Sequence, residues 1–247
     1  MKVLSLNIWG GFCKEKLLDF FDKHQDVDIF CLQEVYHNAT ARVSTDDSPV
    51  TLNILAQIGL VLPNHQIYFF PIVDGIYGIA MLVHSKMKIL AHNNHMIHHN
   101  PSYIGRGPTH SRFLQHLEFE FKNDKMYIIN IHGLWNGNGK TDSDARILQS
   151  KNIKDYISSM VDSVIVCGDF NLRPDTESMA ILNCGMRNLI TEYKVFSTRT
   201  SLYTKDEKFA DYILISPAIK LTHFEVLNDE VSDHAPLLLE IHAGLQK

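Results

Sequence analysis

The chain has 247 residues and a formal net charge of −5, and 45% of its residues are hydrophobic. This apolar share suffices for a large core, and the lack of a long run of one charge argues against a strongly basic protein that coats nucleic acid. No stretch approaches the ~18 apolar residues of a membrane span, and the absence of a Cys-x-x-Cys pattern leads us to expect a reduced, cytoplasmic setting.

The first sixty residues predict an alternation of strands and helices. Apolar runs indicate buried strands, and apolar residues at helical spacing indicate amphipathic helices. The predicted order is strand 1–7, helix 14–25, strand 28–35 and helix 49–60. Both strands finish with polar side chains, Asn7 in the first and Glu34 in the second.

Extended segments dominate the middle of the chain. The predicted strands are 67–72, 77–83, 112–121 and 125–131. Between them, residues 91–111 predict a long loop rich in His, Asn, Gly and Pro, and loops of this length are usually functional or disordered. Its histidines lack a fixed ligand spacing on a helix, so solvated loop histidines are a better interpretation than a metal site.

The C-terminal half returns to strands joined by helices. Its predicted elements are helix 143–160, strand 163–167, helix 176–183, an irregular segment 186–208, and strands 209–215, 220–227 and 236–241. The strand 163–167 is strongly apolar and stops at Gly168, after which Asp169 and Asn171 stand two residues apart. Side chains with this spacing point the same way on extended backbone, although the same residues are also ordinary turn formers.

Eight polar residues each lie at or near the end of a predicted strand. They are Asn7, Glu34, His132, Asp169, Asn171, Asp211, Asp233 and His234. In a layered α/β fold, several strand ends can converge on one rim. The set is rich in oxygen ligands, which suits a hard cation such as Mg²⁺ better than zinc. A histidine paired with an aspartate can act as a general acid or base near neutral pH.

These residues belong to six short motifs. In chain order they are Leu6-Asn7-Ile8, Leu32-Gln33-Glu34, Asn130-Ile131-His132, Gly168-Asp169-Phe170-Asn171, Ala210-Asp211-Tyr212-Ile213-Leu214 and Ser232-Asp233-His234. The ordered set resembles the endonuclease/exonuclease/phosphatase superfamily, whose members are DNase I-like. The resemblance implies an α/β fold, a four-layer α/β/β/α sandwich of two stacked mixed β-sheets flanked by helices. We expect a single domain over residues 1–247.

The resemblance also implies metal-dependent phosphoester hydrolysis and a role for each catalytic residue. Asp169 would orient the attacking water and Asn171 would bind the phosphate. His234 would polarise the phosphate or act as a base, with its ring held by Asp211. His132 would be the second histidine that DNase I-like and sphingomyelinase-like members have and abasic-site endonucleases lack.

The resemblance also implies a cofactor, Mg²⁺ or Mn²⁺. Glu34 would be the main ligand, with Asn7 beside it and Asp233 near the ion. Two short sequence segments resemble branches of the superfamily that act on different substrates. Leu172-Arg173-Pro174 resembles a loop of tyrosyl-DNA phosphodiesterases, whereas Asn7-Ile8-Trp9-Gly10 is similar to the start of sphingomyelinases.

Further side chains are candidates for substrate contact. Arg112 and Arg199 could clamp a phosphodiester, with surface ion pairing as the alternative. Trp135 could stack on a base or a lipid head group, or could simply pack. It lies in the segment 133–141, where Gly139-Lys140-Thr141 suggests a phosphate-binding loop, but the pattern needs a glycine where Leu134 stands. The segment 133–141 is therefore interpreted as either a substrate-facing loop or a plain connector.

We therefore expect a monomeric, metal-dependent phosphodiesterase or nuclease that cleaves a phosphodiester by inline attack of an activated water, with nucleic acid as one candidate substrate. The alternative is a phosphatase or head-group hydrolase acting on a lipid or inositol phosphate, similar to sphingomyelinases. A catalytically inactive binding module on the same fold is disfavoured, because Glu34, Asp169 and His234 are all present.

Overall fold

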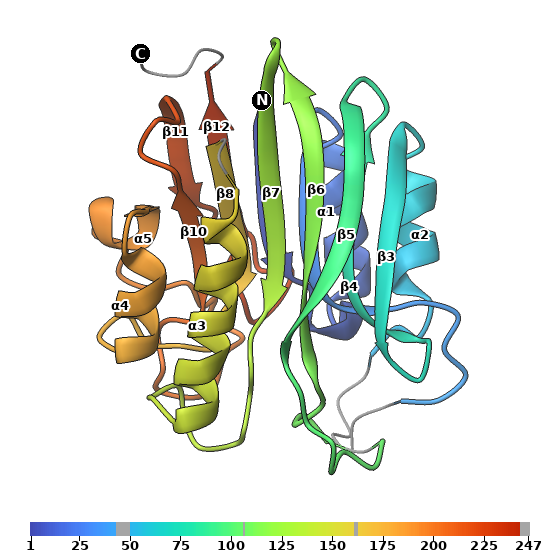
Figure 1. Ribbon diagram of the computed structural model, residues 1–247. Coiled ribbons are helices and arrows are strands. Elements are labelled where there is room, and N and C mark those ends of the chain that lie inside the picture. The colour runs from blue at the N-terminus through green and yellow to red at the C-terminus, as the bar shows by residue number, and fades with distance from the viewer. Residues whose placement is uncertain (43–49, 106, 161–162, 243–247) are drawn as a thin grey trace.

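Two six-stranded mixed β-sheets are stacked face to face, and helices cover the outer face of each sheet (Figure 1). The computed structural model describes residues 1–42, 50–105, 107–160 and 163–242. These layers form the α/β/β/α sandwich that the sequence predicts. None of the helices in the described part of the chain is long and apolar enough to cross a membrane.

The first sheet contains both termini of the folded chain. Its strand order is β11 (Leu221–Val226), β12 (Leu237–Ile241), β1 (Lys2–Asn7), β2 (Ile29–Tyr36), β4 (Tyr77–His84) and β3 (His65–Val73). The central strands β1 and β2 are parallel, and the remaining neighbours are antiparallel. A short 3₁₀ helix, Trp9–Gly11, follows β1.

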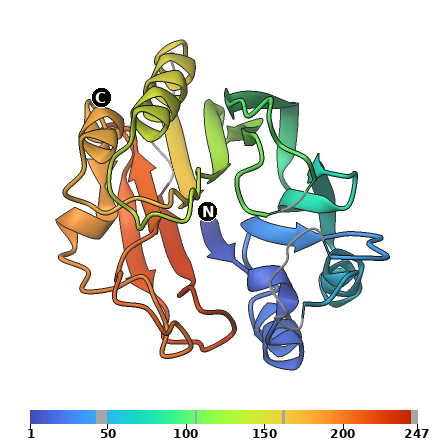
Figure 2. The ribbon, with the colours of Figure 1, turned by 90° about the horizontal axis from the view of Figure 1, so that it is seen from below.

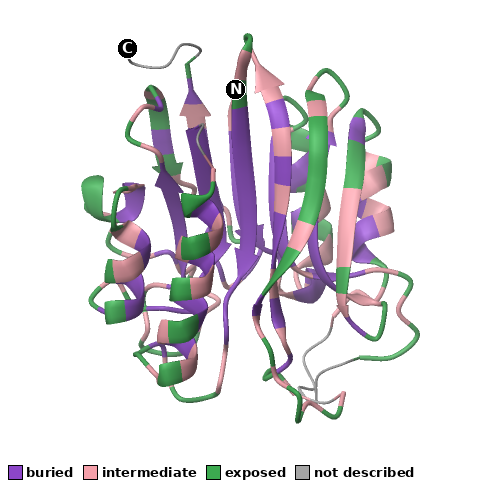
Figure 3. Cartoon of the chain, in the orientation of Figure 1, coloured by how far each residue is buried: buried purple, intermediate pink, exposed green. Residues whose placement is uncertain are grey.

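The second sheet repeats this arrangement around another parallel pair. Its strand order is β5 (Lys88–His98), β6 (Arg112–Phe121), β7 (Asp124–His132), β8 (Ser163–Asp169), β10 (Asp211–Ile215) and β9 (Arg187–Asn188). Only β7 and β8 are parallel among these neighbours. Both strands are buried almost along their whole length, whereas β5 at the edge is largely exposed (Figure 3).

The helices bury one face each against a sheet and leave the other face in solvent (Figure 3). The helices are α1 (Lys14–Lys23) and α2 (Ile54–Val61) on the first sheet, and α3 (Asp144–Ser158), α4 (Glu177–Asn183) and α5 (Leu189–Glu192) on the second. Phe20 and Phe21 of α1 pack with Leu4 and Leu32 of the first sheet. Each fully buried side chain of this size stabilises the fold by roughly 1.5–3 kcal/mol.

A buried polar contact joins the two sheets beneath the edge where β2 and β7 end. Gln33 of β2 donates from Nε2 to Oδ1 of Asn130 on β7 at 2.7 Å, and neither residue is exposed. Asn130 Nδ2 in turn donates to the carbonyls of Leu32 and Ala80, both at 3.1 Å. The ladder between β2 and β4 is irregular between Leu32 and Val35. The Asn130 side chain of the second sheet therefore donates to backbone carbonyls beside a bulge in the first sheet.

Three sequence-based expectations about elements need correction. Residues 91–111 are not one long loop, because 91–98 belong to β5, whose edge position tolerates its polar His and Asn residues. The segment 186–208 is not wholly irregular, since it contains β9 and α5. The helix expected over 49–60 begins at Ile54, and residue 49 lies outside the described residues.

Candidate active site

The carboxyl ends of the parallel pairs β1–β2 and β7–β8 lie at one edge of the sandwich, which Figure 2 views from below. β10 runs antiparallel to β8, so the start of β10 reaches the same edge and Asp211 pairs with Asp169. β12 likewise runs antiparallel to β1, and the turn before it comes back to this edge. Topology thus gathers six of the predicted residues: Asn7, Glu34, His132, Asp169, Asp211 and His234.

Two of the predicted site residues, Glu34 and Asn171, have a left-handed backbone conformation. Glu34 lies at the bulge of β2 with φ 58°, and Asn171 follows β8 with φ 55°. The left-handed region costs a non-glycine residue roughly 1–2 kcal/mol. Asn tolerates this region better than Glu, because its short side chain bonds locally. The bulge redirects the Glu34 carboxylate away from the regular alternation of β2 and towards the edge.

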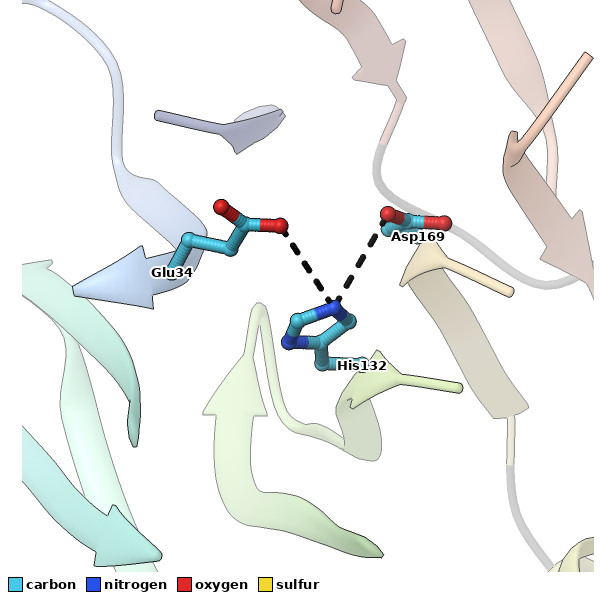
Figure 4. Close-up of side chains that lie close together, drawn as sticks. All are labelled: Glu34, His132 and Asp169. Carbon is cyan, nitrogen blue, oxygen red and sulfur yellow. Dashed lines mark ion pairs between the residues drawn. The ribbon is translucent and has the colours of Figure 1, made fainter. Parts of the chain in front are cut away.

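A cavity of about 440 Å³ opens at this edge, and a carboxylate–histidine group forms its floor. His132 Nε2 lies 3.8 Å from Glu34 Oε1 and 3.9 Å from Asp169 Oδ2 (Figure 4). Asn7 Nδ2 donates to the same two oxygens, at 2.9 Å and 3.0 Å. The ligand atoms of Glu34, His132 and Asp169 all lie within 4.8 Å of one another, which is close enough for one ion.

A second pair sits on the other side of Asp169. His234 Nδ1 lies 2.8 Å and 2.9 Å from the two carboxylate oxygens of Asp211. Thr198 Oγ1 donates to Asp211 Oδ2 at 3.1 Å and so fixes the carboxylate. Because Nδ1 is bonded to Asp211, the ring turns Nε2 towards Asp169 Oδ2, 3.7 Å away. Asp211 thereby sets both the tautomer and the orientation of His234.

The turn after β8 places Asn171 beside this pair. Its backbone N–H donates to Asp169 Oδ1 at 2.8 Å, and its Nδ2 donates to the carbonyl of Gly133 at 3.2 Å. A Cβ at Gly133 would lie 2.2 Å from the Phe170 carbonyl, so only glycine allows this close approach.

The charges of the site shift one another's pKa. Enclosure raises the pKa of Glu34, and the Asn7 hydrogen bond opposes that rise only in part. Burial also disfavours ionised Asp169, but the neighbouring cations, led by Lys140, outweigh it and hold the pKa of Asp169 well below its ordinary value. Burial, together with the charge of Arg112, holds the pKa of His132 well below its usual range, so its imidazole is neutral.

His234 behaves in the opposite way. Burial and Arg199 lower its pKa, but the carboxylates of Asp211, Asp233 and Asp169 outweigh them and raise the pKa above the ordinary value. The ring is therefore more readily protonated at neutral pH than a free histidine. Among the three histidines that line the cavity, burial is the main cause that lowers the pKa of His110 and His132, whereas the carboxylates around His234 outweigh its burial and raise its pKa.

The predicted substrate-contact residues also line the cavity. Arg112 is 1% exposed and donates to the Pro108 carbonyl at 2.8 Å, while its Nε and Nη1 have no partner among the described residues. Arg199 Nη1 lies 3.4 Å from Asp233 Oδ2, and its guanidinium stacks on the Tyr203 ring at 4.0 Å. Asp233 lines the cavity wall through this pair, but it belongs to neither of the convergent ligand groups found in the described residues.

Sequence reasoning missed Lys140 as a separate functional candidate. Its side chain is 3% exposed, lines the cavity and donates from Nζ to Asn171 Oδ1 at 2.5 Å. The Gly139-Lys140-Thr141 pattern drew attention to this position, but the segment is not a glycine-rich loop that opens directly into a helix. The helix that follows starts only at Asp144, with the Ser143 side chain as its cap.

The family model for the endonuclease/exonuclease/phosphatase family matches residues 4–234. No curated protein matches the sequence. Solved structures do match it. An endonuclease/exonuclease/phosphatase from Bacteroides vulgatus is 19% identical with a TM-score of 0.74, covering 99% of this chain and 98% of its own.

Two similar structures carry more specific descriptions. A mannosyl-6-phosphatase from Bacteroides thetaiotaomicron VPI-5482 is 17% identical with a TM-score of 0.75, covering 98% of this chain and 100% of its own. TDP2 from D. rerio, complexed with a single-strand DNA product, is 17% identical with a TM-score of 0.73, covering 98% of this chain and 99% of its own. Likeness at this level of identity shows a shared fold; the first protein is described as a phosphatase and the second as a complex with DNA.

Proposed function

Because the chain belongs to the endonuclease/exonuclease/phosphatase family of phosphoester hydrolases, we propose that it is a Mg²⁺- or Mn²⁺-dependent phosphodiesterase. One observation carries the proposal. Glu34, His132, Asp169 and His234 line a single cavity, the His234 ring is held by Asp211, and the two candidate ligand groups share Asp169. A group that could hold a hard cation thus lies beside an oriented histidine.

The residues present fit such a cation. Two carboxylates approach each other closely enough to share the Asn7 amide, and their repulsion is relieved when a positive charge lies between them. The donors are mainly oxygens and include no cysteine, which suits Mg²⁺ or Mn²⁺. Glu34 would hold the ion, Asn7 would position the two carboxylates through its amide group, and Asp233 lies on the adjoining wall. When bound, such an ion neutralises charge on a phosphoryl oxygen and on the leaving group.

The protein side chains would orient the water, bind the phosphate and donate a hydrogen bond to it. Asp169 stays ionised, so it can accept a hydrogen bond from a water and orient that water for inline attack on phosphorus. His234 carries a proton on Nε2 more readily than a free histidine, so it can donate to a non-bridging phosphoryl oxygen as charge develops there. Asp211 stabilises that imidazolium throughout. Asn171 would hold the phosphate beside them.

The rim of the cavity supports a nucleic-acid substrate. Trp9, Trp135 and Tyr203 line it, and aromatic side chains can stack on bases without demanding a particular sequence. The DNA product of the TDP2 structure lies on a protein of the same fold, which is consistent with this choice. The net charge of −5 favours recognition of a short or single-stranded end within the cavity over coating of a long duplex.

The test is hydrolysis of bis-p-nitrophenyl phosphate, compared with p-nitrophenyl phosphate, in Mg²⁺, Mn²⁺ or EDTA. We expect metal-dependent cleavage of the diester, and we expect His234→Ala to lower kcat by a factor on the order of 10²–10⁴. His223→Ala, which removes an exposed histidine of β11, serves as the matched control and should retain activity. Diester cleavage by His234→Ala at the wild-type rate would remove this residue from the chemistry.

A second candidate is a phosphatase or head-group hydrolase acting on a lipid or inositol phosphate. The observation that favours it is the number of buried cations: Arg112, Lys140 and Arg199 all line the cavity. A phosphomonoester carries up to two negative charges and gains more from such a surplus than a diester does. Metal-dependent cleavage of p-nitrophenyl phosphate alone would select this candidate.

A further inference from the structure

Two residues of α3, Arg146 and Gln149, hold the segment 133–141 in place. Arg146 is 1% exposed, and its guanidinium donates to three carbonyls of this segment, Leu134 at 3.2 Å, Gly139 at 2.7 Å and Thr141 at 2.6 Å. Gln149, one turn further along α3, accepts from the Leu134 N–H at 3.0 Å. These bonds fix the backbone on both sides of Lys140, so the direction of its side chain is set by the fold.

The Lys140 ammonium, on this fixed backbone, lies in the cavity. Nζ donates to Asn171 Oδ1 at 2.5 Å and lies 5.1 Å from the centre of the Trp135 ring. None of the carboxylate oxygens in the described residues lies within salt-bridge distance of Nζ. An ammonium ion has three donors, and one of them is used here.

A buried ammonium without a carboxylate is costly to the folded protein. Burial, opposed by Asp169 but aided by Arg199, lowers the pKa of Lys140 to about 8. A free anion in the cavity would supply the missing partner. Asn171 also ties Lys140 to the Asp169 carboxylate, since the Asn171 backbone N–H donates to Asp169 Oδ1 at 2.8 Å.

We propose that Lys140 is a catalytic residue, whose Nζ donates a hydrogen bond to a non-bridging oxygen of the scissile phosphate. This inference rests on the proposed phosphoester hydrolysis and adds a group to it. Asn171 would position the ammonium, and Arg146 would act as a positioning residue through the backbone of 133–141. No proton is transferred: the ammonium keeps its charge and offsets the negative charge that grows on the phosphoryl oxygens in the transition state.

The first measurement is binding of inorganic phosphate by isothermal titration calorimetry, in the presence of Mg²⁺. We expect Lys140→Met to weaken phosphate binding at least about tenfold, and Lys140→Arg, which keeps the charge, to restore part of the affinity. Lys151→Met is the matched control, because Lys151 is an exposed lysine of α3 that does not line the cavity. Wild-type phosphate affinity in Lys140→Met would overturn the inference.

The second measurement is turnover of whichever p-nitrophenyl ester the wild type cleaves. We expect Lys140→Met to lower kcat by about 10²–10³-fold with a smaller change in KM, and we expect Lys140→Arg to recover part of kcat. If Met and Arg are equally impaired and both melt at a lower temperature than the wild type, the lysine is structural and the inference fails. A wild type that cleaves neither ester contradicts the proposed hydrolysis, whereas the phosphate titration still decides on Lys140.

Discussion

Glu34 illustrates how a single residue is placed at a cost to the fold. It adopts a left-handed backbone at a bulge, and its carboxylate faces Asp169 across the Asn7 amide. Both features disfavour the folded protein unless something compensates for them. Strain and like charge at one position are typical of residues that are kept for binding, and here they point to a cation.

Replacement of this carboxylate tests that interpretation. Glu34→Gln keeps an oxygen for the Asn7 hydrogen bond but removes the charge, so the fold should persist while the affinity for the ion falls. We expect the Mg²⁺ concentration for half-maximal activity to rise on the order of 10- to 100-fold, a range seen even when only the partners of metal ligands are altered. Glu15→Gln, on the exposed side of α1, should leave the titration unchanged. An unshifted curve for Glu34→Gln would exclude it as a ligand.

Lys140 makes a second prediction, about stability and pH. Its pKa in the folded protein is about 8, below the ordinary 10.5, so the unfolded chain binds more protons between these values. The free energy of unfolding therefore rises with pH across this window, by up to about 3 kcal/mol. Below about pH 8 the charged, buried ammonium destabilises the fold, and Lys140→Met should be more stable than the wild type at pH 7.

Comparing the stability of the wild type and Lys140→Met at two pH values tests whether the free energy of unfolding changes with pH in the expected direction. Urea unfolding of both proteins at pH 7 and pH 10 cancels the titration of every group they share. The advantage of Lys140→Met should shrink as the wild-type lysine loses its proton. A difference that stays constant or grows with pH would show that Lys140 is not the group responsible. The same variant is expected to lose phosphate binding, so stability and function would change in opposite directions.

The elements show which features local sequence determines. The apolar runs of β1, β2 and β8 and the polar residues at their ends are visible as patterns, and the family motifs place them in order. The sequence therefore predicted the sandwich and the residues that meet at its edge. β5 was misjudged because a strand at a sheet edge needs no apolar alternation, and its His and Asn residues look like a loop.

Contacts between elements explain what sequence reasoning could not supply. Lys140 is buried where Arg146 and Gln149 of the next helix and Arg173 of the turn after β8 bond to the backbone of the segment 133–141. The segment itself is rich in Gly and Asn, which is equally typical of an exposed connector. The pKa shifts of His132 and His234 differ in direction because the carboxylates around His234 outweigh its burial, whereas burial dominates at His132. Such effects depend on distances across the fold and leave no local pattern.

At the scale of the whole molecule, the two sheets must keep a fixed register for the site to exist. Glu34 comes from the first sheet, and His132 and Asp169 come from the second. The hydrophobic effect that packs the two sheets together is not directional. The contact of Gln33 with Asn130 is directional, and it lies directly beneath the cavity because both residues precede site residues by one or two positions.

Asn130→Leu should therefore affect both the fold and the site. The change leaves the Leu32 and Ala80 carbonyls buried without their donor, and we expect it to lower the free energy of unfolding by about 2–4 kcal/mol. Asn93→Leu, at an exposed asparagine of β5, is the control and should cost far less. Because the Leu32 carbonyl that loses the Asn130 donor lies beside the bulge, the variant should also weaken Mg²⁺ activation through Glu34. Urea unfolding and the metal titration measure the two effects separately.

A double-mutant cycle then isolates the contact between the sheets. In Gln33→Leu the Asn130 Oδ1 loses its partner, and in Asn130→Leu the Gln33 amide loses one, so each single variant buries an unpaired group. In the double variant both members of the pair are apolar, and the loss of stability should be smaller than the sum of the single losses by about 0.5–3 kcal/mol. Additive losses would mean that the two amides act independently, and that apolar packing alone sets the register that brings Glu34 to Asp169.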